Sequence, residues 1–172
     1  MSPGRAVRIV EYDPNWPNRF EWERARVMGV IGDHVLAVEH MGSTSVPGLG
    51  AKPIIDIMAG VRDRETADLC QGLLFIEGYD DVTPEPGQTE WFYCLGTDGG
   101  DLYFHLHLVI FESSHWKRQL MFRDYMRGHP ERAREYYEMK VRLAADYGSD
   151  RQGYTEAKTR FILKTLELAE KE

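Results

Sequence analysis

The chain has 172 residues, of which 42% are hydrophobic and 28% are charged, and its formal net charge is −7. This length fits a single domain over residues 1–172 that buries its own core, and the apolar content excludes bulk disorder. The negative charge argues against general nucleic-acid binding, which needs a basic face, and the longest apolar runs, such as residues 106–111, are too short to cross a membrane.

The N-terminal half predicts an alternation of helices and strands. Residues 7–11 favour a short extended segment, and the prolines of residues 13–17 predict a turn that leads into a helix. An apolar stripe continues from there to Gly32, where we expect this helix to end. The next predicted elements are a strand at 35–39, a β-branched strand at 54–61 and a helix at 64–76.

The C-terminal half predicts a hairpin followed by helices. Residues 80–88 hold two prolines and a glycine and predict an exposed loop, and strands at 91–95 and 102–111 are joined by a glycine-containing connection. Ser113 or Ser114 can cap a helix that runs to about Arg127, and Pro130 begins a second helix that ends near Gly148. A third helix has an apolar face that includes Tyr154. We therefore expect an α/β (α+β) fold, in which a mixed β-sheet core is packed by helices and carries a C-terminal helical cap.

The two cysteines and the N-terminus indicate the compartment. Cys70 and Cys94 show no metal-ligand spacing and are predicted to be buried free thiols in a reducing compartment. Residues 1–5 lack the apolar stretch of a signal peptide. We expect a cytoplasmic protein.

The stretch between the first two predicted strands has the composition of an anion-binding turn. Gly42 follows a strand, so backbone N–H groups can approach an anion closely there, and Ser43 and Thr44 add hydroxyl donors. A helix beginning in this stretch would add a favourable amino end, and Lys52 adds positive charge. The stretch is not a Walker A loop, because proline follows Lys52. The alternative is a structural Gly/Pro loop with incidental hydroxyls.

Asp56 interrupts an apolar strand. An unpaired carboxylate inside such a strand costs several kcal/mol to bury, so Asp56 needs a metal, a cation or water as a partner. Strand alternation puts Ile54, Asp56 and Met58 on one face of the sheet. The alternative is a carboxylate at a strand end that accepts hydrogen bonds from backbone N–H groups.

His105 and His107 lie two residues apart on a predicted strand and therefore share a face. Neutral imidazoles can bind a metal ion, and protonated ones can contact phosphate. The pair resembles the start of a histidine-triad motif, but Val109 occupies the third position and the match fails. The alternative is two histidines on a solvated sheet face.

The predicted helical cap offers further phosphate-binding candidates. Tyr154 and Lys158 are one helical turn apart on the same face, and Arg123 lies in an earlier helix. Lys158 or Arg123 could reach a phosphate chain. Each of them taken singly is more often a surface residue or an ion-pair partner.

Five segments in order carry a family resemblance: YDPNWP at 12–17, HMGSTSVPGLGAKPIIDI at 40–57, HLHL at 105–108, the helical residues 116–129 with FRDY, and YTEAKTRFI at 154–162. With these segments the chain resembles the GrpB family of the nucleotidyltransferase superfamily over essentially its whole length. The resemblance implies a nucleotidyltransferase-like sheet core. It also implies that the Gly42-Ser43 turn contacts phosphates and that Asp56 holds a divalent metal.

The chain departs from the superfamily pattern in its acids. The superfamily carries a second acid two positions after the first, where this chain has Met58, and a third acid on a later strand, where it has His105 and His107. Carboxylates suit Mg²⁺, whereas histidine suits zinc, iron or manganese. The resemblance therefore implies the fold more firmly than the reaction.

Three hypotheses follow for the function. The first is transfer of a nucleotidyl or phosphoryl group from a nucleotide to a small acceptor, with Mg²⁺, Mn²⁺ or Zn²⁺ as the metal. The second is a non-catalytic protein that binds a nucleotide or a phosphorylated small molecule. The third is a metal-dependent enzyme of another type, in which Asp56, His105 and His107 are the ligands.

Overall fold

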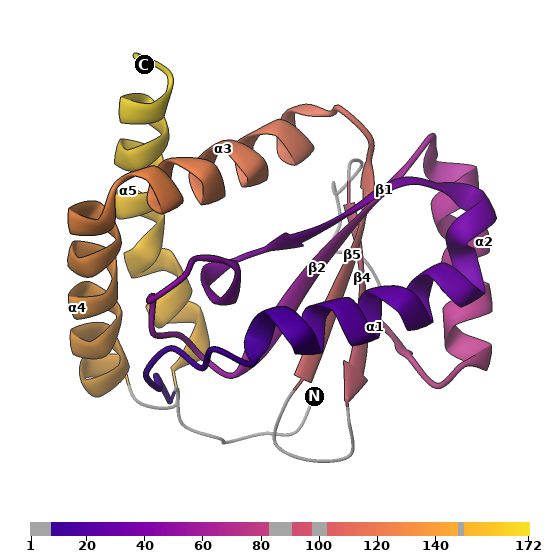
Figure 1. Cartoon of the computed structure of the whole chain (residues 1–172), viewed down its shortest axis with the longest axis horizontal. Coiled ribbons are helices and arrows are strands. Elements are labelled where there is room, and N and C mark those ends of the chain that lie inside the picture. The colour runs from indigo at the N-terminus through magenta and orange to yellow at the C-terminus, as the bar shows by residue number, and fades with distance from the viewer. Residues whose placement is uncertain (1–7, 83–90, 98–102, 148–149) are drawn as a thin grey trace.

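The computed structural model describes residues 8–82, 91–97, 103–147 and 150–172 (Figure 1). In these ranges the helices are α1 (Trp16–Ile31), α2 (Arg64–Ile76), α3 (Ser114–Gly128), α4 (Pro130–Tyr147) and α5 (Arg151–Ala169). The strands are β1 (Val35–Met41), β2 (Ile54–Val61), β3 (Asp80–Val82), β4 (Trp91–Thr97) and β5 (Tyr103–Ile110). Single 3-10 turns lie at Gly32–His34 and Ser43–Ser45.

The strands form one five-stranded mixed sheet in the order β1-β2-β5-β4-β3. The central strands β2 and β5 are parallel, and the other neighbouring pairs are antiparallel. The predicted pairing of the two strands around residues 91–111 is confirmed, and so is the mixed α/β class. One expectation is wrong: Asp80–Val82, predicted to be part of a loop, pairs with β4 as an edge strand. The rest of that predicted loop, 83–88, lies outside the described residues.

Helices cover the two faces of the sheet (Figure 1). The larger core lies between the sheet and the pair α1 and α2, and it is built by one set of alternate strand residues: Ile55, Ile57 and Ala59 of β2, and Phe104, Leu106 and Leu108 of β5. The opposite alternate set faces α3, where Met58 and Val109 pack against Trp116. The predicted alternation of both central strands is therefore confirmed.

The C-terminal helices form the predicted cap on this second face. Ser113 begins α3 by accepting a hydrogen bond from the N–H of Trp116 at 3.2 Å, and Pro130 begins α4. Helices α3, α4 and α5 contact one another and enclose a second apolar cluster that includes Val46, Leu49 and Tyr136. The cap is thus fixed to the loop that follows β1.

The cysteines, the helices and the N-terminal segment can also be compared with the expectations from the sequence. Cys70 and Cys94 are both buried, and they are not joined by a disulfide. None of the described helices combines the length and apolarity required to span a bilayer. The predicted extended segment near the N-terminus is represented by one bridge, between Val10 and Ala51.

Candidate metal and phosphate site

Asp56, His105 and His107 converge on the face of the sheet covered by the helical cap. In the parallel register of β2 and β5, Asp56 lies beside His105 and Met58 lies beside His107. One carboxylate oxygen of Asp56, Oδ1, is 3.5 Å from Nδ1 of His105 and 3.7 Å from Nε2 of His107. The Asp56 side chain remains 26% exposed, so it is not sealed among backbone amides.

The three side chains have a geometry close to that of a metal site. One ligand atom from each lies within 4.8 Å of the other two. Bonds of about 2.1 Å to a zinc-like ion allow its ligand atoms to lie up to about 4.2 Å apart, so small side-chain rotations would suffice for binding. Two imidazoles and one carboxylate form a ligand set typical of zinc, iron or manganese rather than of Mg²⁺.

The electrostatics of Asp56 favour the ionised carboxylate. Burial alone would raise the pKa of Asp56, but its contacts with His105 and His107 outweigh this effect and hold the pKa well below its usual range. An ionised carboxylate is the form that binds a metal ion or accepts hydrogen bonds.

The turn after β1 is shaped by its closeness to Asp56. Gly42 has a positive φ of 71°, and a Cβ at this position would overlap Oδ2 of Asp56. The hydroxyl of Ser45 donates to the carbonyl of Gly42 at 2.6 Å and closes the turn. The segment that follows is a single 3-10 turn, Ser43–Ser45, so the expected amino end of a longer helix is not present there.

Asp56 and His105 line a cavity of about 180 Å³. The turn contributes Ser43 and Thr44 to its wall, and the loop before β2 contributes Lys52. The cap closes it with Lys140 of α4 and with Tyr154 and Lys158 of α5. Most of the predicted site residues thus meet at one place; Gly42 and His107 lie next to the lining through their closeness to Asp56.

Three lysines line the cationic end of this cavity. The Nζ atoms of Lys52 and Lys158 lie 4.5 Å and 4.8 Å from the centre of the Tyr154 ring. The third is Lys140, whose Nζ donates to the carbonyl of Gly50 at 2.7 Å. Burial lowers the pKa of Lys158, so retaining its charge there is costly unless an anion is near.

The sequence interpretation did not include Lys140. A helical lysine is normally solvent-exposed, and nothing in the local sequence marks this one as part of a site. A signal was nevertheless present, because Lys140 continues the buried stripe of Ala133 and Tyr136 at spacings of three and four residues. A charged residue on the apolar stripe of a helix needs a partner or a function.

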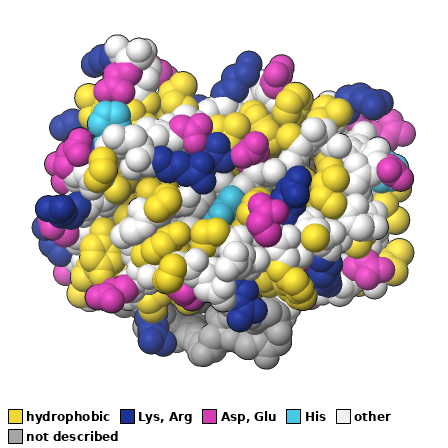
Figure 2. All heavy atoms as spheres, viewed as in Figure 1, with side chains coloured by type: hydrophobic (Ala, Val, Ile, Leu, Met, Phe, Trp, Pro, Cys, Tyr) yellow, Lys and Arg dark blue, Asp and Glu magenta, His cyan; other side chains and the backbone are white. Residues whose placement is uncertain are grey.

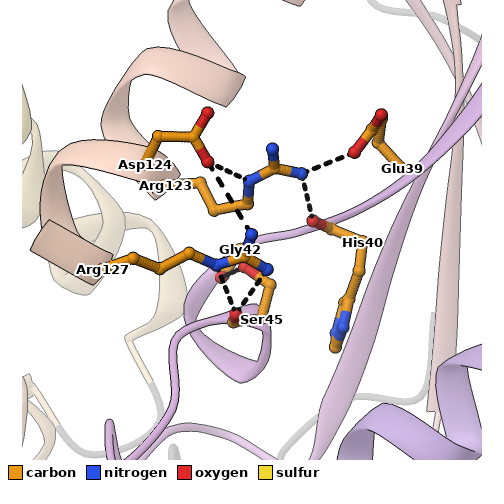
Figure 3. Close-up of polar contacts among 7 residues, drawn as sticks. All are labelled: Glu39, His40, Gly42, Ser45, Arg123, Asp124 and Arg127. Atoms are coloured by element: carbon orange, nitrogen blue, oxygen red, sulfur yellow. Dashed lines mark hydrogen bonds and ion pairs between the residues drawn. The ribbon is translucent and has the colours of Figure 1, made fainter.

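Arg123, predicted to bind phosphate, lies outside the lining of the cavity. Its guanidinium donates to Glu39 at 2.7 Å and to the carbonyl of His40 at 3.0 Å, and it also contacts Asp124 (Figure 3). One turn later, Arg127 donates twice to the carbonyl of Ser45, at 3.0 Å and 2.8 Å. Both arginines therefore connect α3 to the backbone on either side of Gly42.

Charges of both signs are interspersed on the face shown in Figure 2, where blue and magenta side chains alternate over α3 and the end of β1. The basic residues of this face are thus largely balanced by neighbouring acids. The cationic groups of the cavity also contact other kinds of group: Lys52 and Lys158 approach an aromatic ring, and Lys140 donates to a backbone carbonyl.

Comparison with known proteins agrees with this architecture. The sequence model of the family described as GrpB protein matches residues 6–168. A UPF0157 protein of Halalkalibacterium halodurans is 36% identical over 170 residues, which cover 98% of this chain and 86% of that protein. A UPF0157 protein of Bacillus subtilis is 33% identical over 167 residues, but the chain spans only 48% of its length.

A solved structure shows the same fold. The crystal structure of GrpB from Enterococcus faecalis superposes with a TM-score of 0.82 at 34% identity, covering 94% of this chain and 96% of that one. The chain is thus a mixed α/β protein with a helical cap over a cavity lined by an acid, one histidine and three lysines, and a second histidine lies beside the acid. It belongs to the GrpB family.

Proposed function

We propose that this protein binds the phosphate groups of a nucleotide together with a divalent metal ion, and that it transfers a nucleotidyl or phosphoryl group to a small acceptor. One observation carries the proposal: a single cavity is lined at once by Asp56 and His105 of the metal-type cluster and by Lys52, Lys140 and Lys158. A metal ion and ammonium groups are the complementary partners of a phosphate chain.

The size of the cavity indicates which part of the ligand it would hold. Its volume of about 180 Å³ is below the roughly 300–1,000 Å³ of pockets that enclose drug-sized molecules. We therefore infer that phosphate groups enter the cavity and that the nucleoside lies at its mouth. In this arrangement Asp56, His105 and His107 would hold the metal, which when bound supplies positive charge to phosphate oxygens. Lys52 and Lys158 would bind the remaining phosphate oxygens.

A second candidate function, binding without transfer, is favoured by Met58. This residue stands where the superfamily resemblance expects a second acid, and it is fully buried against Met41, Val109 and Trp116. The cluster therefore offers one carboxylate where two-metal phosphoryl transfer uses several. A protein that kept the phosphate cavity but lost the chemistry would bind a nucleotide and leave it intact.

Calorimetry with the four ribonucleoside triphosphates tests the proposal. We expect binding only in the presence of Mn²⁺, Zn²⁺ or Mg²⁺, and an affinity at least about 10-fold lower in Lys158→Met, because one charge-assisted contact is worth about 1.5–3 kcal/mol. Lys164→Met on the exposed side of the same helix is the matched control. Chromatography of the nucleotide after incubation with candidate acceptors separates transfer from binding alone. Failure of every nucleotide and metal combination to bind would contradict both candidates.

A further inference from the structure

Lys140 is a buried lysine without an acidic partner in the part of the chain that the structure describes. Its side chain is only 3% exposed, yet no carboxylate oxygen of a described residue lies within ion-pair distance of Nζ. Among the described residues, Nζ donates a hydrogen bond to the carbonyl of Gly50 at 2.7 Å, and the ring centre of Tyr136 lies 4.7 Å away. A buried ammonium in such surroundings must either lose its proton or gain an anion.

The neighbours of Lys140 favour the neutral amine when no anion is bound. Burial has the largest effect, and the positive charges of Lys158 and Lys52 add to it, lowering the pKa of Lys140 to about 7. A large share of Lys140 is therefore unprotonated near neutral pH. A neutral lysine amine beside other cations is an activated nucleophile.

We propose that Lys140 is a site of covalent attachment for small phosphorylated aldehydes or ketones, whose phosphate group is bound by Lys52 and Lys158. The lone pair of Nζ would add to the carbonyl carbon, and the carbonyl oxygen would take up protons and leave as water. The product is an imine between Lys140 and the carbonyl compound. The amine and the carbonyl compound together contain all the atoms of the imine and the released water, so no further reactant is needed.

The same cavity accounts for the chemical class of the ligand. The two flanking lysines approach one ring, that of Tyr154, and attract an anionic group to the side of Lys140. With about 180 Å³ available, the carbonyl and the phosphate must belong to a short molecule. This inference goes beyond the proposed function, because imine formation requires neither a metal ion nor Asp56.

Reductive trapping tests the proposal. The full-length protein is incubated in EDTA with glycolaldehyde phosphate and cyanoborohydride, and the modified lysines are located by peptide mass spectrometry. We expect Lys140 to be modified at least 10-fold faster by glycolaldehyde phosphate than by glycolaldehyde, and faster than the exposed Lys164 and Lys171. Lys158→Met should slow the modification of Lys140, whereas Lys164→Met should not.

Two results would overturn the proposal. One is even modification of all lysines; the other is equal rates with the phosphorylated and unphosphorylated aldehydes. Both are read from the wild-type protein, so they do not depend on whether a variant folds. Trapping in EDTA is also independent of nucleotide binding: trapping without nucleotide binding would contradict only the proposed function, and nucleotide binding without trapping would contradict only this inference.

Discussion

Gly42 and Asp56 lie so close together that no other residue type fits at position 42 without moving the carboxylate. A Cβ on Gly42 would overlap Oδ2 of Asp56 and would approach its Cγ to 3.0 Å. The turn after β1 therefore packs directly against the acid of β2, and the same turn contributes Ser43 and Thr44 to the cavity wall. This contact joins the phosphate-binding and metal-binding halves of the candidate site.

Replacing Gly42 by alanine tests this contact. We expect Gly42→Ala to lower the free energy of unfolding by about 1 kcal/mol because of its positive φ, and by a further 1–3 kcal/mol because the methyl group collides with Asp56. Gly48→Ala is the matched control: Gly48 has a φ of 77° and no atom within 4 Å of its Cβ position. Urea unfolding measures the free energy of unfolding of both variants. Equal losses of stability in the two would show that the contact with Asp56 is unimportant.

The metal cluster yields a second prediction. We expect His105→Ala and His107→Ala each to reduce the affinity for Mn²⁺ or Zn²⁺ at least about 10-fold, because even outer partners of metal ligands are worth 10–100-fold. Metal analysis of protein purified without chelators, followed by titration of the metal-free protein, measures the effect. His34→Ala, in the 3-10 turn just before β1, should bind as the wild type does. Unchanged metal affinity in both cluster variants would show that the cluster is a carboxylate–imidazole contact and not a metal site.

Much of the candidate site could be predicted because strands have a fixed period. Alternation along β5 requires His105 and His107 to share a face, and the parallel register, which places Asp56 beside His105, puts Asp56 on that same face. The helix boundaries at Ser113 and Pro130 were likewise predictable from local chemistry, since capping and the geometry of proline act within one turn.

The remaining features depend on long-range contacts. Strand β3 has three residues and takes its stability from β4, so its own sequence carries little signal. The partner of Arg123, Glu39, is 84 residues away along the chain, and no local pattern distinguishes an ion pair from a phosphate contact. Lys140 is buried only because α4 packs over the loop around Gly50. Sequence patterns place residues on faces, whereas tertiary packing decides which charges become buried.

Arg127 yields a third prediction, about the stability of the turn. Ser45 is buried, and its carbonyl accepts both hydrogen bonds from Arg127 (Figure 3). Arg127→Met would leave this carbonyl without these donors, which costs about 1–3 kcal/mol. Arg134→Met, on an exposed position of α4, should change the free energy of unfolding by less than about 0.5 kcal/mol. Equal stability of the two variants would contradict a role for Arg127 in holding the turn.

His40 is held in its neutral form behind the same turn. Its Nε2 lies 3.1 Å from the hydroxyl of Thr44, and its ring stacks on Phe20 with the ring centres 4.6 Å apart. Burial is the main reason that the pKa of His40 falls to about 4; the positive charges of Arg127 and Arg123 act in the same direction, and Asp56 opposes them. Protonation of His40 is therefore coupled to unfolding.

The sign of this coupling gives the last prediction. Above pH 6.5, the ordinary histidine value, both folded and unfolded states keep His40 neutral and the stability is complete. Between pH 6.5 and about 4, only the unfolded state binds the proton, so the folded state loses stability as the pH falls, by about 2 kcal/mol at pH 5 and about 3 kcal/mol at pH 4. Urea unfolding at pH 7 and pH 5 measures this loss. His40→Gln should remove this loss of stability between pH 7 and pH 5, and the control His34→Gln should retain it. The same loss in the wild type and in both variants would show that His40 does not titrate in this way.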